Sequence, residues 1–381
     1  MGGARVLNIG RDPSPFSKTK GGDLLARLAH YSKYIDYSCM ITVDKSGKKN
    51  ASISGNGFEV IGVNANPIFY LLEGFSAGTG AVWKKRIALI NAQDPFLCGI
   101  LGWILRKYFL IRGKKKILVV DMHANLINNE KWLREKWQNP LLNLIGKRIL
   151  RSADYVRAVS PGIKKNLEEA GVEGRKIFVI PVGTDIKALE AKTKPRKGAG
   201  KRILFVGRLV EGKNVDLLLE GFSEFKEANL DSSLTILGGG PEKRALEQLS
   251  STLGAGAVFT GMVGHDKLWE YYENADVLVL PSSHEGWGLV VLEAFASGIP
   301  VIASKAVEEV NPTVEDGESA IVIGSLDAEG IAKTFGRFFA LSEEERNLLV
   351  QEGRKRADEF DIEQVSKKRG EMLGKIVEGR P

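Results

Sequence analysis

Short runs of apolar and β-branched residues alternate with longer amphipathic stretches along the first half of the chain. The apolar runs predict strands at 5–9, 37–43, 58–63, 86–91, 116–121, 155–160 and 177–181. Between several of them, apolar residues recur at helical spacing, for example over 22–34 and 161–170. Because strands that alternate with helices pair in parallel through right-handed crossovers, the pattern predicts an α/β layer fold.

A polar segment, AKTKPRKGAGK at 191–201, interrupts this alternation. It contains Pro195, Gly198 and Gly200, which are typical of a linker. The alternation then restarts, with strands predicted at 203–206, 234–237, 258–260, 276–280, 301–304 and 320–323. Three helical patterns close the chain, the last over Ile362–Val377.

Two doubly wound, Rossmann-like domains follow from this organisation, at 1–190 and 202–360. A chain of 381 residues supports two cores, since single cores rarely grow beyond about 300 residues. The remaining segment, 361–381, is expected to pack back on the N-terminal domain. Ligands of such sheets bind beyond the carboxyl ends of the strands. We therefore expect the two domains to face one another across a ligand-binding cleft.

The composition, 43% apolar and 27% charged residues, is that of an ordinary globular protein. The two cysteines, Cys39 and Cys98, stand in apolar surroundings without disulfide or metal-ligand spacing, which predicts buried free thiols in a reducing compartment. The N-terminus lacks the pattern of a secretory signal. The longest apolar run, 96–105, is too short to span a bilayer. A cytoplasmic location is expected.

Charge is distributed unevenly along the chain. Residues 1–190 hold 30 Lys and Arg against 16 Asp and Glu, whereas residues 191–381 hold 24 against 31. The basic half suggests an anionic partner, such as a membrane surface, a phosphorylated acceptor or nucleic acid, although a solvated surface explains it equally well. Of these partners, nucleic acid is not expected. The stretch 106–116 ends in the cluster Lys114–Lys116 and suits either peripheral contact with an anionic membrane or, the favoured interpretation, a buried crossover helix followed by a solvated turn.

Candidate chemistry lies between the strand at 276–280 and a helix predicted to begin near Leu289. The connecting residues contain Gly286 and Gly288. A strand, a glycine-bearing loop and a helix N-terminus together favour an anion site, because the first N–H groups of the helix are unpaired. Glu285 precedes the helix and Glu293 lies within its first two turns. Two carboxylates beside an anion site suit a nucleotide sugar, although the spacing alone also fits a surface residue and a helix-dipole partner.

Two cations follow the first predicted strand of the C-terminal domain. Arg208 and Lys213 stand in the loop after Val206. A guanidinium can bind phosphate oxygens with a fork, and an ammonium supplies a point charge. Because a departing nucleoside diphosphate gains negative charge, fixed cations at this position would lower the barrier.

Six ordered segments carry a family resemblance. They read FVGRLVEGKN, LTILGGGPEKRALEQL, VFTGMV, LWEYYENADVLVLPS, HEGWGLVVLEAFASGIPVIAS and VEDGESAIVI, and they cover almost all of 203–324. Together they resemble the donor domain of retaining glycosyltransferases of family 4, which have the GT-B fold. The resemblance implies metal-independent, cofactor-free transfer of a hexose-type sugar from a nucleoside-diphosphate sugar to a glycan, lipid-linked or other anionic acceptor. Consistently, the chain contains no Asp-x-Asp pair.

The resemblance also implies roles for individual residues. Arg208 and Lys213 would bind the donor diphosphate, Glu293 the ribose, and Glu285 the transferred sugar. The remaining donor-binding positions implied in the C-terminal domain are Gly207, Gly286, Trp287, Gly288, Leu289 and Val290. We expect the Trp287 ring itself to form an aromatic wall or part of the core. The family's Gly-Gly and Pro-Glu pairs are absent from 305–312, which leaves donor contacts on this side open.

The N-terminal domain offers two positions that resemble the family. Gly21 and Gly22, in Lys20-Gly21-Gly22-Asp23, are placed like a glycine pair that lines the cleft. His123 follows the strand at 116–121 and resembles the histidine that such enzymes place beside the transferred sugar. Its position at the end of a parallel strand favours a functional role, and a structural role is the alternative.

Other functions compete with transfer to an acceptor. A GT-B relative acting as a phosphorylase, epimerase or hydrolase would use the same donor site, and a nucleotide-binding protein without activity would share the fold. The presence of Glu285 and Glu293 together with Arg208 and Lys213 in one chain disfavours the inactive protein. An NAD-dependent dehydrogenase is disfavoured because no Gly-x-Gly-x-x-Gly follows any predicted strand.

Overall fold

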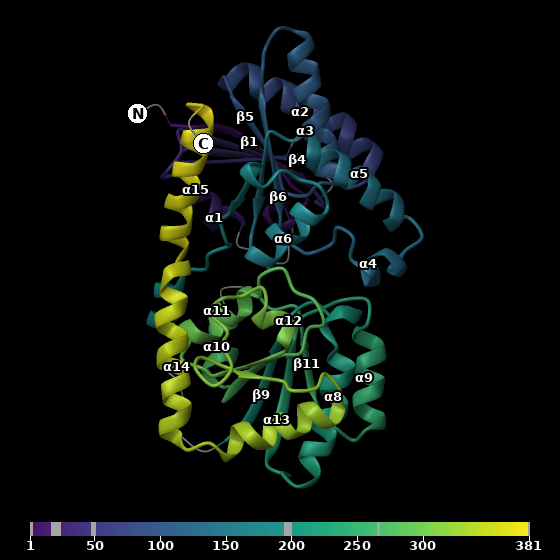
Figure 1. The fold of residues 1–381 in the computed structure, drawn as a ribbon, viewed down its shortest axis with the longest axis vertical. Coiled ribbons are helices and arrows are strands. Elements are labelled where there is room, and N and C mark those ends of the chain that lie inside the picture. The colour runs from purple at the N-terminus through teal and green to yellow at the C-terminus, as the bar shows by residue number, and fades with distance from the viewer. Residues whose placement is uncertain (1–2, 17–23, 47–50, 194–199, 265–266, 380–381) are drawn as a thin grey trace. The chain divides into compact units, whose positions relative to one another are not determined.

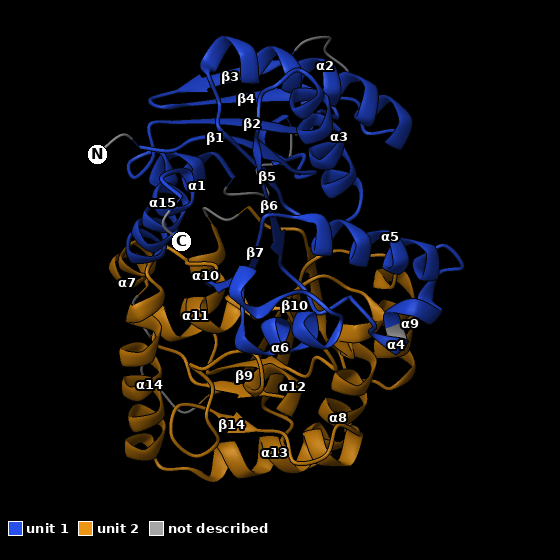
Figure 2. Ribbon diagram, turned by 45° about the horizontal axis from the view of Figure 1, so that its top comes forward, with its two compact units in different colours: residues 1–181, 362–381 blue, residues 182–361 orange. Residues whose placement is uncertain are grey.

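A computed structural model describes residues 3–16, 24–46, 51–193, 200–264 and 267–379. The chain divides into two compact units (Figure 2). Unit 1 comprises residues 1–181 and 362–381, and unit 2 comprises 182–361. The division therefore falls at 181, before the boundary at 190 expected from sequence. Helix α7 (Ile186–Lys192) belongs to unit 2, where it packs against α11 (Leu289–Ala296).

Unit 1 contains an eight-stranded sheet in the order β3-β4-β2-β1-β5-β6-β7-β8. Figure 2 shows its strands from β3 to β7 in this order. Every neighbouring pair is parallel except β3 and β4, which form an antiparallel hairpin. The strands are β1 (Arg5–Ile9), β2 (Tyr37–Val43), β3 (Ser52–Gly55), β4 (Phe58–Val63), β5 (Leu89–Ala92), β6 (Ile117–Met122), β7 (Tyr155–Ala158) and β8 (Ile177–Val179). The order in which successive strands are added reverses between β1 and β5. Ligands of doubly wound sheets bind at such a switch point.

The helices of unit 1 cover this sheet. They are α1 (Leu24–Tyr31), α2 (Pro67–Lys85), α3 (Leu97–Ile111), α4 (Glu130–Glu135), α5 (Asn139–Ser152), α6 (Pro161–Glu169) and α15 (Ile362–Val377). Local sequence sets where they begin: Asn66 caps α2, and Ser160 caps α6 with Pro161 in its first turn.

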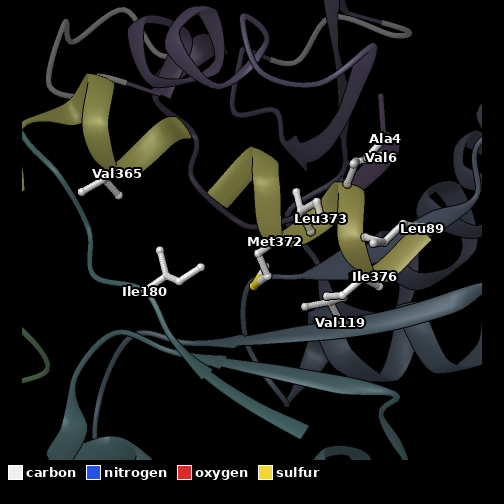
Figure 3. Close-up of a cluster of buried hydrophobic side chains, with 9 residues drawn as sticks. All are labelled: Ala4, Val6, Leu89, Val119, Ile180, Val365, Met372, Leu373 and Ile376. Carbon is white, nitrogen blue, oxygen red and sulfur yellow. The ribbon is translucent and has the colours of Figure 1, made fainter. Parts of the chain in front are cut away.

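The C-terminal helix α15 completes the core of unit 1 (Figure 3). Met372, Leu373 and Ile376 belong to one buried cluster with residues of β1, β5 and β6. Figure 3 shows these side chains pointing from α15 toward the strands. A segment far away in sequence therefore supplies part of the apolar layer over the N-terminal strands.

Unit 2 contains a six-stranded parallel sheet in the order β11-β10-β9-β12-β13-β14. Its strands are β9 (Lys201–Val206), β10 (Ser232–Leu237), β11 (Val258–Gly261), β12 (Val277–Leu280), β13 (Val301–Ala303) and β14 (Ile321–Val322). Besides α7 and α11, its helices are α8 (Val215–Glu227), α9 (Lys243–Thr252), α10 (Leu268–Glu273), α12 (Lys305–Glu308), α13 (Ala328–Ala340) and α14 (Glu343–Ala357). The strand order is that of a dinucleotide-binding Rossmann sheet, with the switch point between β9 and β12.

Most predicted strands are present, with differences at their ends. The run at 86–91 begins as a strand only at Leu89, because Arg86 adopts the left-handed conformation that ends α2. The hairpin strand β3 had no counterpart in the prediction. The helix expected over 22–34 spans Leu24–Tyr31, and residues 22 and 23 lie outside the described part of the chain. Cys39 and Cys98 are both free and buried, as expected.

Candidate functional site

Two loops of unit 2 leave the sheet at its switch point. Residues 207–214 follow β9, and 281–288 follow β12, the neighbouring strand. Since parallel neighbours end at the same edge of a sheet, both loops lie beyond the same carboxyl edge. The predicted cations stand in the first loop and the predicted carboxylate Glu285 stands in the second.

Hydrogen bonds hold the two loops together. The Asn214 side chain donates to the carbonyl of Pro281 at 2.7 Å, and the Ser283 N–H donates to the carbonyl of Gly212 at 3.0 Å. Asn214 has a φ of 50°, a left-handed conformation that asparagine tolerates better than most residues. Gly212 leaves room for the His284 ring, because a Cβ there would lie 2.2 Å from its Cε1 atom. The contact positions the cations and Glu285 together.

Lys213 and Glu285 form the ion pair at the centre of these loops. The ammonium donates to Oε2 of Glu285, and the two side chains are only 17% and 16% exposed. The Gly286 N–H donates to Oε1 at 3.1 Å, and the Ser282 hydroxyl donates to Oε2 at 3.4 Å. These contacts therefore orient both groups at the carboxyl edge. Arg208, in the same loop as Lys213, is exposed.

Glu293 lies inside α11 and is almost fully buried, with 4% exposure. The Tyr272 hydroxyl, from α10, donates to its Oε2 atom at 2.8 Å. Burial, reinforced by the adjacent carboxylate, raises the pKa of Tyr272 well above its usual range. Tyr272 therefore stays protonated and orients Glu293. The sequence patterns gave no indication of this partner, because a tyrosine in an amphipathic helix normally packs in the core.

The loop before α11 is fixed from the opposite side by Asn311. This buried side chain donates to the carbonyl of Trp287 at 2.8 Å. The Trp287 ring is 4% exposed and lies edge-on to Phe360, with ring centroids 5.0 Å apart. Trp287 is thus a core residue, in agreement with one of the two expected positions of its ring. Because the Trp287 ring is buried, the donor contact predicted for this residue is restricted to its backbone atoms.

The backbone at the start of the helix is arranged for close approach. Gly288 precedes α11 with a φ of 75°, and Leu289 and Val290 begin the helix half-buried.

The loop after β10 packs closely on the loop after β9. A Cβ on Gly238 would lie 1.8 Å from the carbonyl oxygen of Gly207. Glycine is therefore required at Gly238, which also has a φ of 136°.

A separate polar cluster lies in unit 1, at the ends of β5, β6 and β7. The Asp121 carboxylate is fully buried and accepts from Arg157 at 3.2 Å and from Arg369 of α15 at 2.9 Å. The Asn91 amide also donates to it. Burial disfavours the charged form, but Arg369 and Arg157 outweigh this and hold the pKa of Asp121 below its usual value. Asp121 therefore anchors α15 to the sheet.

His123 follows this cluster at the end of β6. Its Nε2 atom lies 3.8 Å from Oδ2 of Asp121, and its side chain is 41% exposed. Partial burial, together with the Arg157 cation, lowers the pKa of His123 below its usual value. The imidazole is therefore neutral near pH 7 and can both donate and accept hydrogen bonds. The structure brings His123 together with Asp121 in unit 1.

Not every predicted position can be described. Gly21 and Gly22, with Lys20 and Asp23, lie outside the described residues. Residues 305–312, which depart from the family pattern, form the short helix α12 and the turn that carries Asn311. That segment therefore supports the donor loop through a buried amide.

The two Rossmann-like sheets define a GT-B protein, and the loops with Arg208, Lys213 and Glu285 lie at the switch point of its second sheet. Residues 187–356 match the family model of glycosyl transferases group 1, and residues 48–188 match that of glycosyltransferase family 4. The chain belongs to this glycosyltransferase family.

Relatives and solved structures agree with this assignment. The chain is 29% identical to a GDP-mannose-dependent phosphatidylinositol monomannoside mannosyltransferase of Mycolicibacterium smegmatis, over 53% of this chain and 57% of the relative. It is also 29% identical to a sulfoquinovosyl transferase of Arabidopsis thaliana, over 55% of this chain and 42% of the relative. The match thus spans about half the length of these curated relatives.

Solved structures of similar fold extend over nearly the whole chain. A sucrose-phosphate synthase from Thermosynechococcus elongatus superposes with a TM-score of 0.81 at 23% identity, covering 99% of this chain and 100% of that one. Anabaena HepE in complex with UDP-glucose superposes with a TM-score of 0.75 at 17% identity, covering 97% and 99%. At these identities the likeness concerns the fold.

Proposed function

We propose that this protein transfers a hexose-type sugar from a nucleoside-diphosphate sugar to an acceptor, with retention of anomeric configuration and without a metal ion. The observation that carries the proposal is the Lys213–Glu285 pair, positioned with Arg208 at the switch point of unit 2. A cation there suits a diphosphate, and a carboxylate suits sugar hydroxyls.

In this proposal the loops stabilise the leaving group. As the bond between the anomeric carbon and the diphosphate oxygen breaks, negative charge develops on the phosphates. The acceptor's hydroxyl oxygen bonds to that carbon on the same face, and its proton passes to the departing phosphate. Lys213 and Arg208 lower the energy of that charge, and the N–H groups at the start of α11 add to this effect. Glu285 orients the sugar and Glu293, held by Tyr272, binds the ribose. Positioning and charge stabilisation supply the catalysis, without a protein nucleophile.

For the acceptor we propose a glycan, a lipid-linked sugar or another anionic molecule, bound by unit 1, with His123 beside the transferred sugar. Support comes from the basic N-terminal half and from the neutral imidazole at the end of β6. Nucleic acid is not proposed as a partner. We also propose a cytoplasmic location, supported by the two free, buried thiols. No helix in the described ranges is long and apolar enough to cross a membrane.

Donor binding is tested by thermal unfolding of the protein with UDP-, GDP- and ADP-hexoses, in buffers with and without EDTA. A donor present at a hundred times its dissociation constant stabilises the native state by about 2.7 kcal/mol, which raises the melting temperature measurably. One nucleotide series should stabilise the wild type and fail to stabilise Lys213→Ala. Absence of a shift with all three series would contradict the proposal, and a shift that EDTA abolishes would contradict metal independence.

A further inference from the structure

Apolar side chains are unusually exposed along two helices of unit 1. Helix α3 packs against both α2 and α5 (Figures 1 and 2). On α3, Trp103 is 37% exposed and Leu110 is 50% exposed. On α5, Leu141 and Leu144 are 59% and 63% exposed. Exposed apolar residues that gather on one face mark a binding surface more often than scattered ones do.

The spacing of these residues places them in stripes. On α5, Leu144 follows Leu141 by three residues and Arg148 follows Leu144 by four. On α3, Lys107 follows Trp103 by four residues and Leu110 follows Lys107 by three. Residues at this spacing share one side of a helix. Lys147, three residues after Leu144, also lines the groove between these helices. We call the seven residues together the α3–α5 face: Trp103, Lys107, Leu110, Leu141, Leu144, Lys147 and Arg148.

A groove runs between the two helices. Its volume is about 900 Å³, and its walls include Ile100, Trp103, Ile104, Leu144 and Ile145. The basic residues at the groove are Lys107, Lys147, Arg148 and Arg151. None of its lining residues, all of which the structure describes, is acidic. The groove is therefore apolar inside and positively charged around it.

The charge of the surrounding helices has the same sign. Helices α2, α3 and α5 together contain seven Lys and Arg residues and one acidic residue, Glu73. Four of the seven make polar contacts within unit 1. Arg106 pairs with Asp154 at 2.7 Å, and Arg151 donates to the carbonyl of Ala170 at 2.7 Å. Lys85 pairs with Glu59 at 3.9 Å, and Lys147 donates to Oδ1 of Asn128 at 3.3 Å. A surface that combines exposed Trp and Leu with Lys and Arg is complementary to an anionic bilayer.

The basic cluster at Lys114–Lys116 is less suitable for this contact than its sequence indicates. Lys116 donates to the carbonyl of Ile87 at 2.5 Å, and burial lowers its pKa. The Lys114 ammonium lies 4.0 Å from the centre of the Trp83 ring. Both side chains thus make contacts within unit 1, and the combined apolar and basic surface lies on the α3–α5 face.

We propose that the α3–α5 face docks on the surface of an anionic phospholipid bilayer, with its groove open to lipid acyl chains and its Lys and Arg residues on the lipid phosphates. The proposal deepens the proposed function, on which it rests, by naming the kind of surface at which the acceptor is met. Binding to vesicles requires neither donor nor acceptor. Its failure is therefore distinguishable from failure of sugar transfer.

The test is co-sedimentation of the full chain with two kinds of vesicle. One is made of phosphatidylcholine alone, and the other also contains about 30 mol% of the anionic lipid phosphatidylglycerol. Each Lys or Arg near such a surface contributes about fivefold in affinity. The triple variant Lys107→Gln, Lys147→Gln, Arg148→Gln should therefore lose roughly a hundredfold in binding to the anionic vesicles. The double variant Trp103→Ser, Leu144→Ser should also bind more weakly.

A matched control removes three exposed cations from unit 2, Lys333, Arg337 and Lys355, each replaced by Gln. It changes the net charge equally and should bind like the wild type. Equal loss in the control, or equal binding to both vesicle types at low salt, would overturn the proposal. So would a wild type that ignores vesicles but forms a dimer that Trp103→Ser, Leu144→Ser dissociates, since a second copy would then occupy the face.

Discussion

Replacing Arg369 by Met should loosen α15 from unit 1. Arg369 is 7% exposed and donates to Asp121, which is fully buried. Removing one partner from a buried ion pair costs about 3–5 kcal/mol. Because Arg157 remains 3.2 Å from the same carboxylate, we expect a value near the lower limit, about 3 kcal/mol. Methionine retains much of the apolar stem, so the change tests the charge more than the packing.

Amide hydrogen exchange over 362–377 measures this cost. If the free energy needed to open α15 falls by about 3 kcal/mol, the amides that exchange through this opening should exchange roughly a hundredfold faster. Lys368→Met, at the adjacent exposed position, serves as the control. Exchange in Arg369→Met that equals the control would refute the idea that Asp121 anchors α15.

The pH dependence gives a second readout of the same cluster. The folded pKa of Asp121 is below its unfolded value, so its contribution to stability is present above an unfolded pKa of about 3.9 and is lost as pH falls through the folded pKa. Without Arg369 the folded pKa rises. The difference between the unfolded and folded pKa of Asp121 is then smaller, so the protection of α15 should depend less on pH in the acid range in the variant than in the wild type.

Three further changes test other parts of the structure. Tyr272→Phe removes the hydroxyl that orients Glu293, so calorimetry should show weaker nucleotide binding, by about tenfold, with the fold intact. Gly238→Ala forces a Cβ toward the Gly207 carbonyl; its melting temperature should fall by several degrees, and an unchanged value would contradict the close packing. The pKa of Glu363 is lowered to about 2 by His30, Tyr34 and Lys33, so its stabilisation is present above about pH 4.5 and lost toward pH 2. Glu363→Gln should flatten the acid limb of an unfolding curve, by 1 kcal/mol at most because the pair is partly exposed, about 40% for Glu363.

Periodicity predicted the strands of both sheets because most of them are short, buried and parallel. The last helix was predicted at Ile362–Val377, where the structure has it, since its apolar stripe is regular and its core positions are buried. The hairpin strand β3 escaped prediction because SISG is polar and short, and it forms only by pairing with β4. The division at 181 depends on contacts of 182–190 with unit 2, which local sequence does not encode.

Part of the candidate site could also be predicted. Motif spacing placed Arg208, Lys213 and Glu285 on loops that meet at the switch point. It did not indicate that Lys213 and Glu285 pair, nor that Tyr272 and Asn311 hold the carboxylate and the loop, because each partner comes from a distant segment. Asn214 stood in a recognised motif, yet its contact with Pro281 required the fold. The same limit applies to Asp121, Arg157 and Arg369, which meet only through β6, β7 and α15.

The central claim is that Arg208 and Lys213 stabilise the leaving diphosphate in a sugar transfer that retains anomeric configuration. It is most directly tested by time-resolved proton NMR of donor turnover by the wild type, Arg208→Ala and Lys213→Ala. With the nucleotide sugar that stabilises the protein, the first-formed product should keep the donor's anomeric configuration. Removing fixed charge from a developing anion costs about 2.7–4 kcal/mol, so each variant should turn over at least a hundredfold more slowly while remaining folded. Near wild-type turnover in both variants, or a product with inverted configuration, would contradict the account.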